Sequence, residues 1–287
     1  MIAALKPAFQ KDEAFLHDVR NALSRGVFRL WWLGQSGFLL VNQGRALLLD
    51  PYLSDSLTRK YAGTDKPHER ITERVVDPAA LGALGVIVVV TSSHLHTDHL
   101  DRDTLEPILA LNPQASLLIP EANRTEVVNR LGSLLAPRIV GIDAGAAAKV
   151  GDIEFIGIPA AHNQVERDAQ GRCRFLGYVM RFGNKVFYHS GDTVWHEGLV
   201  PILRPMEVDI AFLPINGNRP ERRVAGNLDG LEAARLAKNI QAKLAIPCHF
   251  DLFHFNTASP VEFASECDRL GQPYRVLCNG EGIDLQY

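Results

Sequence analysis

The chain has 287 residues, of which 46% are hydrophobic and 22% are charged, so it can bury a sizeable core and carries no sign of disorder. Its 30 basic and 33 acidic residues leave a net charge of -3, which excludes a general electrostatic attraction to nucleic acid or to anionic membranes. No apolar run approaches the roughly 18 residues that a membrane-spanning helix needs. We therefore expect a soluble globular protein that binds neither nucleic acid nor membranes.

The N-terminal part of the sequence predicts one helix, three strands and a long polar segment. Apolar residues at helical spacing indicate a helix over residues 11–24. Three strand-like runs follow, separated by turn-forming sequences, at residues 28–33, 38–41 and 46–49. Residues 52–80 are polar and without clear period, and a segment of this length is typically functional, as a lid or a binding loop. Its basic and aromatic residues are Arg59, Lys60, Tyr61, His68 and Arg70.

Further along, strands and helices alternate without a flexible linker or a low-complexity segment. Helices are expected over residues 104–111, 124–131, 231–240 and 261–270. Strands are expected over residues 86–90, 116–119, 138–142, around Lys149, and over 153–158, 175–182, 185–188, 210–214 and 244–246. We therefore expect an α/β protein in which residues 1–287 form one domain, with helices covering two sheets.

The cysteines and the first residues of the chain predict a cytoplasmic location. The four cysteines are Cys173, Cys248, Cys267 and Cys278. They are scattered and form no Cys-x-x-Cys pair, which is typical of free thiols in a reducing compartment. Residues 1–15 already mix basic and acidic side chains and offer no apolar centre of a signal peptide. Cys248 directly precedes His249, so it is either a buried structural thiol or a minor candidate near a site.

The stretch over residues 92–101, directly after a predicted strand, has the densest cluster of reactive side chains in the sequence. It reads Ser-Ser-His-Leu-His-Thr-Asp-His-Leu-Asp. Imidazole nitrogens and carboxylate oxygens are the ligands that suit zinc, iron or manganese. The candidate metal ligands here are His94, His96, Asp98 and His99, and a His-rich turn without a metal is the alternative.

Three more residues that can bind metal each follow a short apolar strand, and they are His162, Asp192 and His249. Loops that leave one edge of a sheet are where sites are usually built on a rigid scaffold. The candidates divide into two predicted groups. The first group is His94, His96 and His162, and the second is Asp98, His99 and His249. Asp192 is predicted to bridge two divalent metal ions, one in each group.

The metal motif and several other stretches resemble a known family. The His-x-His-x-Asp-His motif, the later histidines and Gly191-Asp192-Thr193 resemble proteins of the metallo-β-lactamase fold. A narrower resemblance, over about residues 28–279, is to the L-ascorbate-6-phosphate lactonase branch. The stretches that carry it are Trp32-Leu33-Gly34-Gln35-Ser36-Gly37-Phe38, Asp50-Pro51-Tyr52-Leu53-Ser54-Asp55-Ser56, Tyr188-His189-Ser190-Gly191-Asp192-Thr193, Pro214-Ile215-Asn216-Gly217, Gly226-Asn227 and Phe255-Asn256-Thr257.

The resemblance implies a four-layer αβ/βα sandwich, with manganese or zinc held at the shared edge of two sheets and activating a water for hydrolysis. It also implies that Asp50 orients a ligand imidazole, and an aspartate that only caps a turn is the alternative. Two positions depart from the branch, which usually has Thr before the first motif histidine and Arg directly after Pro-Ile-Asn-Gly. Here Ser93 and Asn218 stand at those positions, and neither change touches the metal ligands.

Other polar residues near the motifs are candidates for contact with substrate. His189 either donates a proton to the leaving group or makes a structural hydrogen bond. His254 and Asn256 follow the last predicted ligand and are candidate substrate contacts. Arg219 and Arg222 either bind a phosphate, through bidentate guanidinium donors, or belong to a solvated loop.

These observations predict a dinuclear metal-dependent hydrolase in which Asp98 also orients the nucleophile. The leading substrate class is a lactone of a phosphorylated or acidic sugar, so the expected partner is a small anionic molecule. A metal-dependent phosphodiesterase of the same fold and a non-catalytic metal-binding protein are the alternatives. The sequence is compatible with a homo-oligomer and does not determine the oligomeric state.

Overall fold

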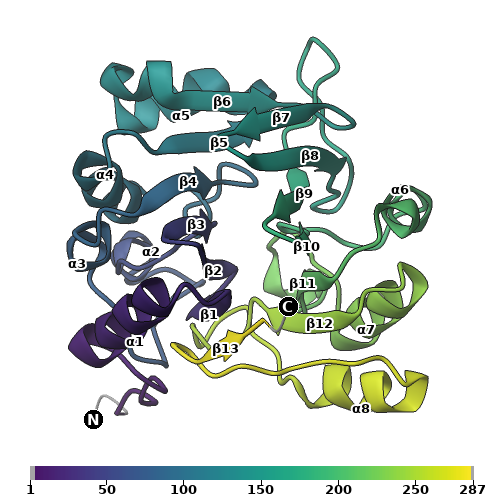
Figure 1. Cartoon of the computed structure of the whole chain (residues 1–287). Coiled ribbons are helices and arrows are strands. Elements are labelled where there is room, and N and C mark those ends of the chain that lie inside the picture. The colour runs from purple at the N-terminus through teal and green to yellow at the C-terminus, as the bar shows by residue number, and fades with distance from the viewer. Residues whose placement is uncertain (1–3, 286–287) are drawn as a thin grey trace.

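The computed structural model describes residues 4–285 and contains two β-sheets enclosed by helices (Figure 1). The first sheet has the strand order β13 (Gly282–Asp284), β1 (Arg29–Gly34), β2 (Gly37–Asn42), β3 (Arg45–Leu49), β4 (Ile87–Thr91), β5 (Ser116–Pro120) and β6 (Ile139–Ile142). The second sheet has the order β12 (Leu244–Cys248), β11 (Ile210–Pro214), β10 (Lys185–His189), β9 (Leu176–Phe182), β8 (Ile153–Pro159) and β7 (Ala147–Val150).

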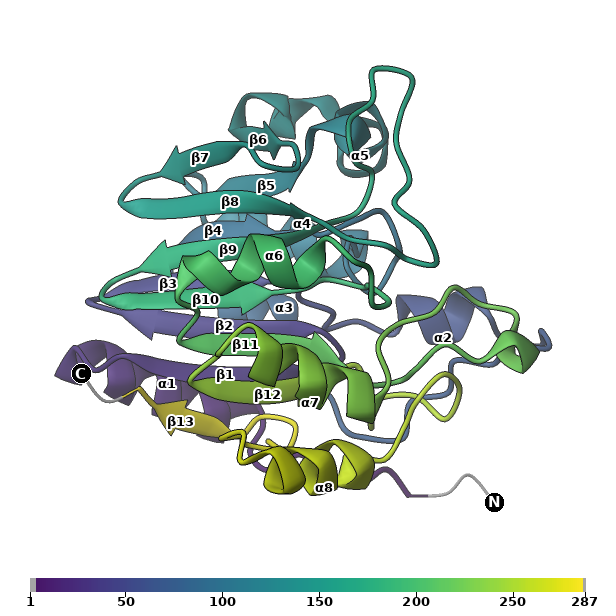
Figure 2. The ribbon, with the colours of Figure 1, turned by 90° about the vertical axis from the view of Figure 1, so that its right-hand side faces the viewer.

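Helices cover the outer faces of both sheets. The helices on the side of the first sheet are α1 (Asp12–Arg25), α3 (Pro78–Gly82), α4 (Arg102–Leu111) and α5 (Arg124–Leu131). Those on the side of the second are α6 (Leu199–Leu203), α7 (Gly230–Asn239) and α8 (Val261–Leu270). The short helix α2 (Ser56–Lys60) lies at one end of the sandwich, as Figure 2 shows. The four-layer αβ/βα sandwich predicted from the sequence is therefore confirmed.

Both sheets are mixed, and their strand directions bring several loops to one end of the molecule. In the first sheet β3 and β4 are parallel, and in the second β10, β11 and β12 are parallel. β8 runs in the same direction as β10, because each of them pairs antiparallel with β9. The loops after these strands meet at the end where Figure 2 shows α2.

The central strands of the first sheet are buried on both faces. In β1, Leu30 and Trp32 belong to a core shared with the second sheet, whereas Trp31 and Leu33 belong to the core under α1, α3 and α4. Successive side chains of a strand point to opposite faces, so one strand supplies both cores. This explains why these strands read as continuous apolar runs and not as alternating ones.

The predicted helices and long strands are present, with most bounds shifted by one or two residues. Apart from short 3-10 helices, four short elements were not predicted. They are α2, within residues 52–80, α3, which begins at the end of that segment, and α6 and β13. Each has at most five residues, too few to establish a hydrophobic period in the sequence.

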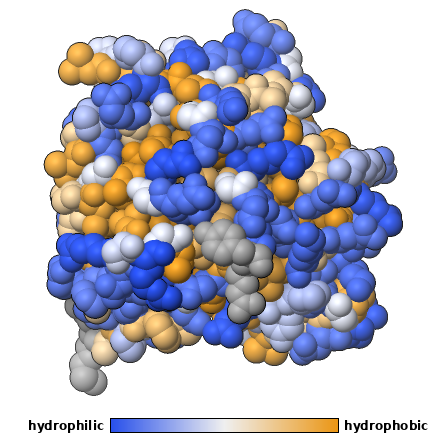
Figure 3. All heavy atoms as spheres, in the orientation of Figure 1, coloured by the Kyte–Doolittle hydropathy of each residue, from blue (hydrophilic) through white to orange (hydrophobic). Residues whose placement is uncertain are grey.

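Both hydrophilic and hydrophobic residues are exposed on the surface. Within residues 4–285, no helix combines the length and the apolar character that crossing a bilayer requires. Figure 3 shows a face on which hydrophobic residues are interspersed with hydrophilic ones. The large hydrophobic residues that are exposed in the described part of the chain are Leu5, Phe9, Leu111, Leu134 and Val261.

Candidate metal centre

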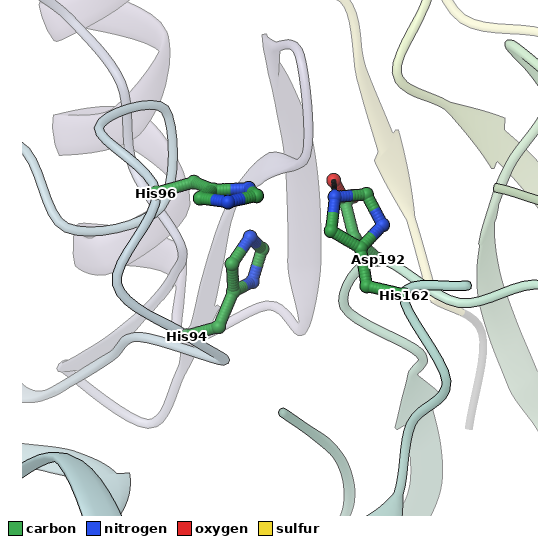
Figure 4. A group of neighbouring side chains, drawn as sticks. All are labelled: His94, His96, His162 and Asp192. Atoms are coloured by element: carbon green, nitrogen blue, oxygen red, sulfur yellow. Dashed lines mark ion pairs between the residues drawn. The ribbon is translucent and has the colours of Figure 1, made fainter. Parts of the chain in front are cut away.

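Seven side chains that can bind metal gather where strands of both sheets end. The loop between β4 and α4 carries His94, His96, Asp98 and His99, while His162, Asp192 and His249 follow β8, β10 and β12. The loop is fixed at its far end by Asp101, whose carboxylate caps α4 by accepting a hydrogen bond from the Thr104 amide at 3.1 Å. Figure 4 shows His94 and His96 on one side of the site and His162 and Asp192 on the other.

The first group consists of His94, His96, His162 and Asp192, whose ligand atoms all lie within 4.8 Å of one another. The ring centroids of His94 and His96 are 4.6 Å apart, and those of His96 and His162 are 5.0 Å apart. Nδ1 of His162 donates a hydrogen bond to the Gly226 carbonyl oxygen at 2.8 Å, which leaves Nε2 for the group.

The second group consists of Asp98, His99 and His249, whose ligand atoms also lie within 4.8 Å of one another. Oδ2 of Asp98 is 3.7 Å from Nε2 of His99 and 3.4 Å from Nε2 of His249. His249 adopts a φ of 60°, a left-handed conformation that is uncommon for a residue with a Cβ atom. Its amide donates a hydrogen bond to the Gln35 carbonyl oxygen at 2.9 Å, which holds this conformation.

Asp192 lies between the two groups. Its Oδ2 is 3.7 Å from Nε2 of His162, in the first group, and 3.5 Å from Nε2 of His249, in the second. Its Oδ1 is 3.3 Å from Nε2 of His99. The carboxylate therefore faces both groups at once.

The buried carboxylate of Asp50, which follows β3, orients His99. Its Oδ2 is 2.7 Å from Nδ1 of His99 and accepts a hydrogen bond from the Ser93 amide at 3.1 Å. Its Oδ1 accepts a hydrogen bond from the Thr91 hydroxyl at 2.8 Å. Burial opposes ionisation of Asp50, but the charge of His189 and the hydrogen bond from His99 hold its pKa below the ordinary value. These contacts fit the orienting role predicted for Asp50.

Opposite charges dominate the second group. Burial alone would lower the pKa of His249, but Asp192 and Asp98 outweigh it and raise that pKa to about 9. The pKa of His99 is raised well above its ordinary value by the same two carboxylates, also against the effect of burial. The pKa of His94 falls well below the ordinary value, because its ring is buried and because the positive charges of His99 and His96 also oppose its protonation. Divalent cations would replace the protons that now neutralise these carboxylates.

The donor atoms of the site fit bound metal ions. Nε2 of His94 is buried and makes no hydrogen bond to any of residues 4–285. The same is true of Nε2 of His99 and Oδ1 of Asp192, which approach each other without hydrogen-bond geometry. Buried polar atoms without a partner are costly, and imidazole nitrogens and carboxylate oxygens of this kind are suitable ligands for zinc or manganese.

The two groups open into a cavity of about 510 Å³. The predicted ligands that line it are His96, Asp98, His162, Asp192 and His249. The other polar residues on its wall are Lys60, Tyr61, Lys66, His68, Thr97, Arg130 and Asn256. The polar segment over residues 52–80, predicted as a lid or binding loop, thus contributes four of these residues. A second cavity, of about 480 Å³ between α7 and α8, contains none of the predicted ligands.

Of the residues predicted to contact substrate, only Asn256 lines the cavity. Arg222 uses its guanidinium within the protein, donating to the Asn216 carbonyl at 2.6 Å and the Thr257 carbonyl at 2.9 Å. Arg219 and His254 are exposed and lie outside the cavity. The geometry therefore does not support a phosphate-binding role for Arg219 or Arg222, or a substrate contact for His254.

His189, predicted as a catalytic residue, lies beneath the site. Its side chain is buried and does not line the cavity. Nε2 of His189 donates a hydrogen bond to the Ser36 carbonyl oxygen at 2.8 Å. This is the structural hydrogen bond that the sequence left as the alternative, so the geometry does not support proton donation by His189.

Two residues that hold the site were not predicted. Nε2 of Gln35 donates to Oδ2 of Asp98 at 2.8 Å. In the sequence Gln35 is marked only by its place in a Gly-Gln-Ser-Gly turn, within a stretch that resembles the lactonase branch. Arg130 of α5 donates through Nη1 to the carbonyl oxygens of Leu95 and Leu100, at 2.7 and 3.0 Å, and so fixes the metal loop. No local pattern marks Arg130, because the carbonyl groups it binds lie 30 or more positions away.

The sequence profile of the beta-lactamase superfamily domain matches residues 45–250. The chain therefore belongs to the beta-lactamase superfamily, as the metal motif and the sandwich predict. Within it, a relative from Opitutus terrae named "UPF0173 metal-dependent hydrolase" is 30% identical over 262 residues, which cover 90% of this chain and 100% of the relative. The chain is thus a metal-dependent hydrolase of this superfamily, and the narrower lactonase branch stays a prediction.

Solved structures show the same fold. Igni18, a metallo hydrolase from the archaeon Ignicoccus hospitalis, aligns with a TM-score of 0.65 and 20% identity over 91% of this chain and 99% of its own. An isothiocyanate hydrolase from Delia radicum gut bacteria aligns with a TM-score of 0.68 and 18% identity over 89% of this chain and 98% of its own. At these identities the likeness supports the fold and not the substrate.

Proposed function

We propose that this metal-dependent hydrolase binds two divalent metal ions, manganese or zinc, and opens the lactone ring of a phosphorylated or acidic sugar. The observation that carries the proposal is the presence, in one cavity, of two His/Asp groups and three cationic side chains, Lys60, Lys66 and Arg130. When bound, such a pair of ions lowers the pKa of a water molecule and stabilises the negative charge that develops during hydrolysis.

The seven candidate ligands form two groups, one for each ion. His94, His96 and His162 would hold one ion, and Asp98, His99 and His249 would hold the other. Asp192 would neutralise charge on both sides, since its carboxylate faces both groups. Asp98 also lines the cavity, so its carboxylate orients the attacking water. Asp50 and Gln35 keep His99 and Asp98 in position.

The cations on the cavity wall favour an anionic substrate. Lys60 is exposed and has its Nζ 3.4 Å from the Thr97 hydroxyl, directly beside the metal loop. Arg130 uses only Nη1 in hydrogen bonds with residues 4–285, so its other guanidinium donors remain for a ligand. Guanidinium and ammonium groups at a metal site suit a carboxylate or phosphate on the substrate. The complete set of ligands argues against a non-catalytic metal-binding protein.

The test compares lactones with and without a phosphate, in the presence of manganese or zinc. The phosphorylated lactone should have a Michaelis constant roughly tenfold to a hundredfold lower than the same lactone without phosphate. This is the factor that one charge-assisted contact of about 1.5–3 kcal/mol contributes to affinity. Lys60→Gln should reduce that difference. Arg59→Gln is the matched control, because Arg59 is the neighbouring cation on α2, pairs with Asp103 and does not line the cavity.

A phosphodiesterase would give the opposite pattern. It would cleave bis(p-nitrophenyl) phosphate and show no preference among lactones. If phosphodiester cleavage is the faster reaction and lactones are untouched, the lactonase proposal is wrong.

A further inference from the structure

His68 is held rigidly at the cavity wall by aromatic neighbours. Its ring stacks on Tyr61, with centroids 4.5 Å apart and an angle of 29° between the planes. Phe253 and Phe255 contact it from other sides, with centroid distances of 5.4 and 5.2 Å. The Thr58 hydroxyl donates to the backbone carbonyl of His68 at 2.6 Å. Ring and backbone are therefore both fixed, which suits a residue that must meet a reacting atom in one orientation.

The tautomer of His68 follows from its neighbours. Nδ1 lies 2.8 Å from the Lys66 carbonyl oxygen, and because a carbonyl can only accept, Nδ1 must carry the hydrogen. In the neutral ring Nε2 is then an acceptor. This nitrogen makes no hydrogen bond to the described residues, 4–285, while the side chain lines the cavity together with Asp98 and His249.

The surroundings of His68 favour the neutral ring. Burial is the largest influence and lowers the pKa of His68, and the positive charge of Lys60 acts in the same direction. The Lys66 carbonyl and Asp98 oppose this without reversing it, so the pKa lies below the ordinary value. The neutral ring keeps the unshared electron pair of Nε2 available on the cavity side, as a general base requires.

The other histidines near the cavity cannot fill this role. His96, His162 and His249 belong to the metal groups. His189 is buried and bonded to the Ser36 carbonyl. Among the described residues this leaves His68 as the one cavity histidine outside the metal groups.

We infer that His68 is a catalytic residue that delivers a proton to the leaving oxygen during ring opening, an inference that rests on the proposed hydrolysis. The oxygen of water forms a bond to the acyl carbon, and the bond from that carbon to the ring oxygen breaks. The electron pair of the broken bond stays on the ring oxygen. Nε2 takes the proton that the attacking water loses and places it on that oxygen, so His68 ends as it began.

The experiment varies the leaving group. His68→Asn keeps an amide donor near the Lys66 carbonyl but removes the nitrogen at the Nε2 position. A lactone has a strongly basic alkoxide leaving group that needs a proton, whereas a p-nitrophenyl ester releases a stable phenolate. We expect kcat for the lactone to fall by roughly 10²–10⁴-fold, the usual value of a positioned acid–base group, with little change for the p-nitrophenyl ester.

Three further measurements make the result decisive. Metal content and thermal melting of His68→Asn and His68→Gln show that the variants are folded and loaded. His17→Asn, an exposed histidine on α1, is the control and should change neither rate. An equal loss on both substrates, or no loss on the lactone, overturns the proton-transfer role.

The same design separates this inference from the proposed function. If the wild-type protein opens no lactone but cleaves phosphodiesters, the lactonase proposal fails. An alkyl and a p-nitrophenyl phosphodiester then replace the two esters, and a selective loss on the alkyl substrate still supports proton transfer by His68. If the wild-type protein hydrolyses neither substrate class with manganese or zinc, both proposals are overturned.

Discussion

At the scale of single residues, Asp192 and His189 lie three positions apart but differ in what they can do. The Asp192 carboxylate faces imidazoles of both groups, at 3.3–3.7 Å. His189 is buried, does not line the cavity and donates a hydrogen bond to one backbone carbonyl oxygen. A charge between two cations contributes far more than one neutral hydrogen bond, which is worth about 1 kcal/mol.

We therefore predict that Asp192→Asn is far more damaging to activity than His189→Gln. Turnover and metal content should fall together in Asp192→Asn, turnover by more than about 100-fold, since even partners that only orient a ligand cost 10–100-fold when removed. His189→Gln should lose about 1 kcal/mol of stability and keep its metal. Elemental analysis and steady-state kinetics of both variants are the measurement. Loss of activity confined to His189→Gln would contradict the assignment.

Site residues that belong to a local sequence motif can be predicted from the sequence. Site residues that reach the cavity only through tertiary packing cannot. The seven ligand candidates could be predicted because each follows an apolar strand and has suitable chemistry. Lys66 and Arg130 could not be predicted as site residues. Lys66 reaches the cavity through the packing of the polar segment over residues 52–80, and Arg130 through the packing of α5. The predicted Arg222 has the right charge, but its hydrogen bonds to Asn216 and Thr257 form only in the folded chain.

At the scale of elements, an ion cluster around Glu266 joins α7 to α8. Glu266 of α8 is 5% exposed and accepts hydrogen bonds from Arg235 of α7 and Arg269, each at 2.8 Å. The hydrogen bonds from Arg269 and Arg235 lower the pKa of Glu266 from 4.5 to about 2. A carboxyl group whose pKa is lower in the folded state stabilises that state above the unfolded pKa.

The contribution of Glu266 should accordingly be complete above about pH 4.5 and disappear as the pH falls towards about 2. We predict that Glu266→Gln melts at a lower temperature than the wild type at pH 7. The difference should narrow steadily between pH 5 and about pH 3. Thermal melts across this range measure it. A difference that does not depend on pH would mean that packing, and not charge, is what the substitution removes.

The elements that the sequence could not predict depend on their neighbours for stability. β13 has three residues and becomes a strand only by pairing with β1, where Ile283 is opposite Leu30. α2 buries a single residue, Leu57. By contrast, the long apolar runs of β1 to β3 are predictable, because both of their faces must be covered.

At the scale of the whole molecule, the metal centre joins the two sheets. His94, His96, Asp98 and His99 come from the first, and His162, Asp192 and His249 from the second. Ligands from both sides converge only in the folded chain, so metal binding is linked to folding.

Removal of the metal should therefore lower the melting temperature. An ion present at 100 times its dissociation constant contributes about 2.7 kcal/mol, which corresponds to a shift of about 4–5 °C in a chain of this size. Calorimetry before and after chelation, followed by the return of manganese or zinc, measures the shift.

Elemental analysis of the protein should give about two equivalents of metal. A single equivalent that does not increase on adding either ion would contradict the dinuclear centre.

The pairing of β1 with β13 also bears on how the protein is made. Arg29 and Asp284 are 255 positions apart, yet they form an ion pair at 2.7 Å. During translation β1 leaves the ribosome long before residues 282–284 exist, so its outer edge stays without a partner for most of synthesis. Unpaired edges recruit strands from other chains, and such distant pairing is slow to form. The nascent chain is thus most exposed to aggregation until β13 arrives and pairs with this edge of β1.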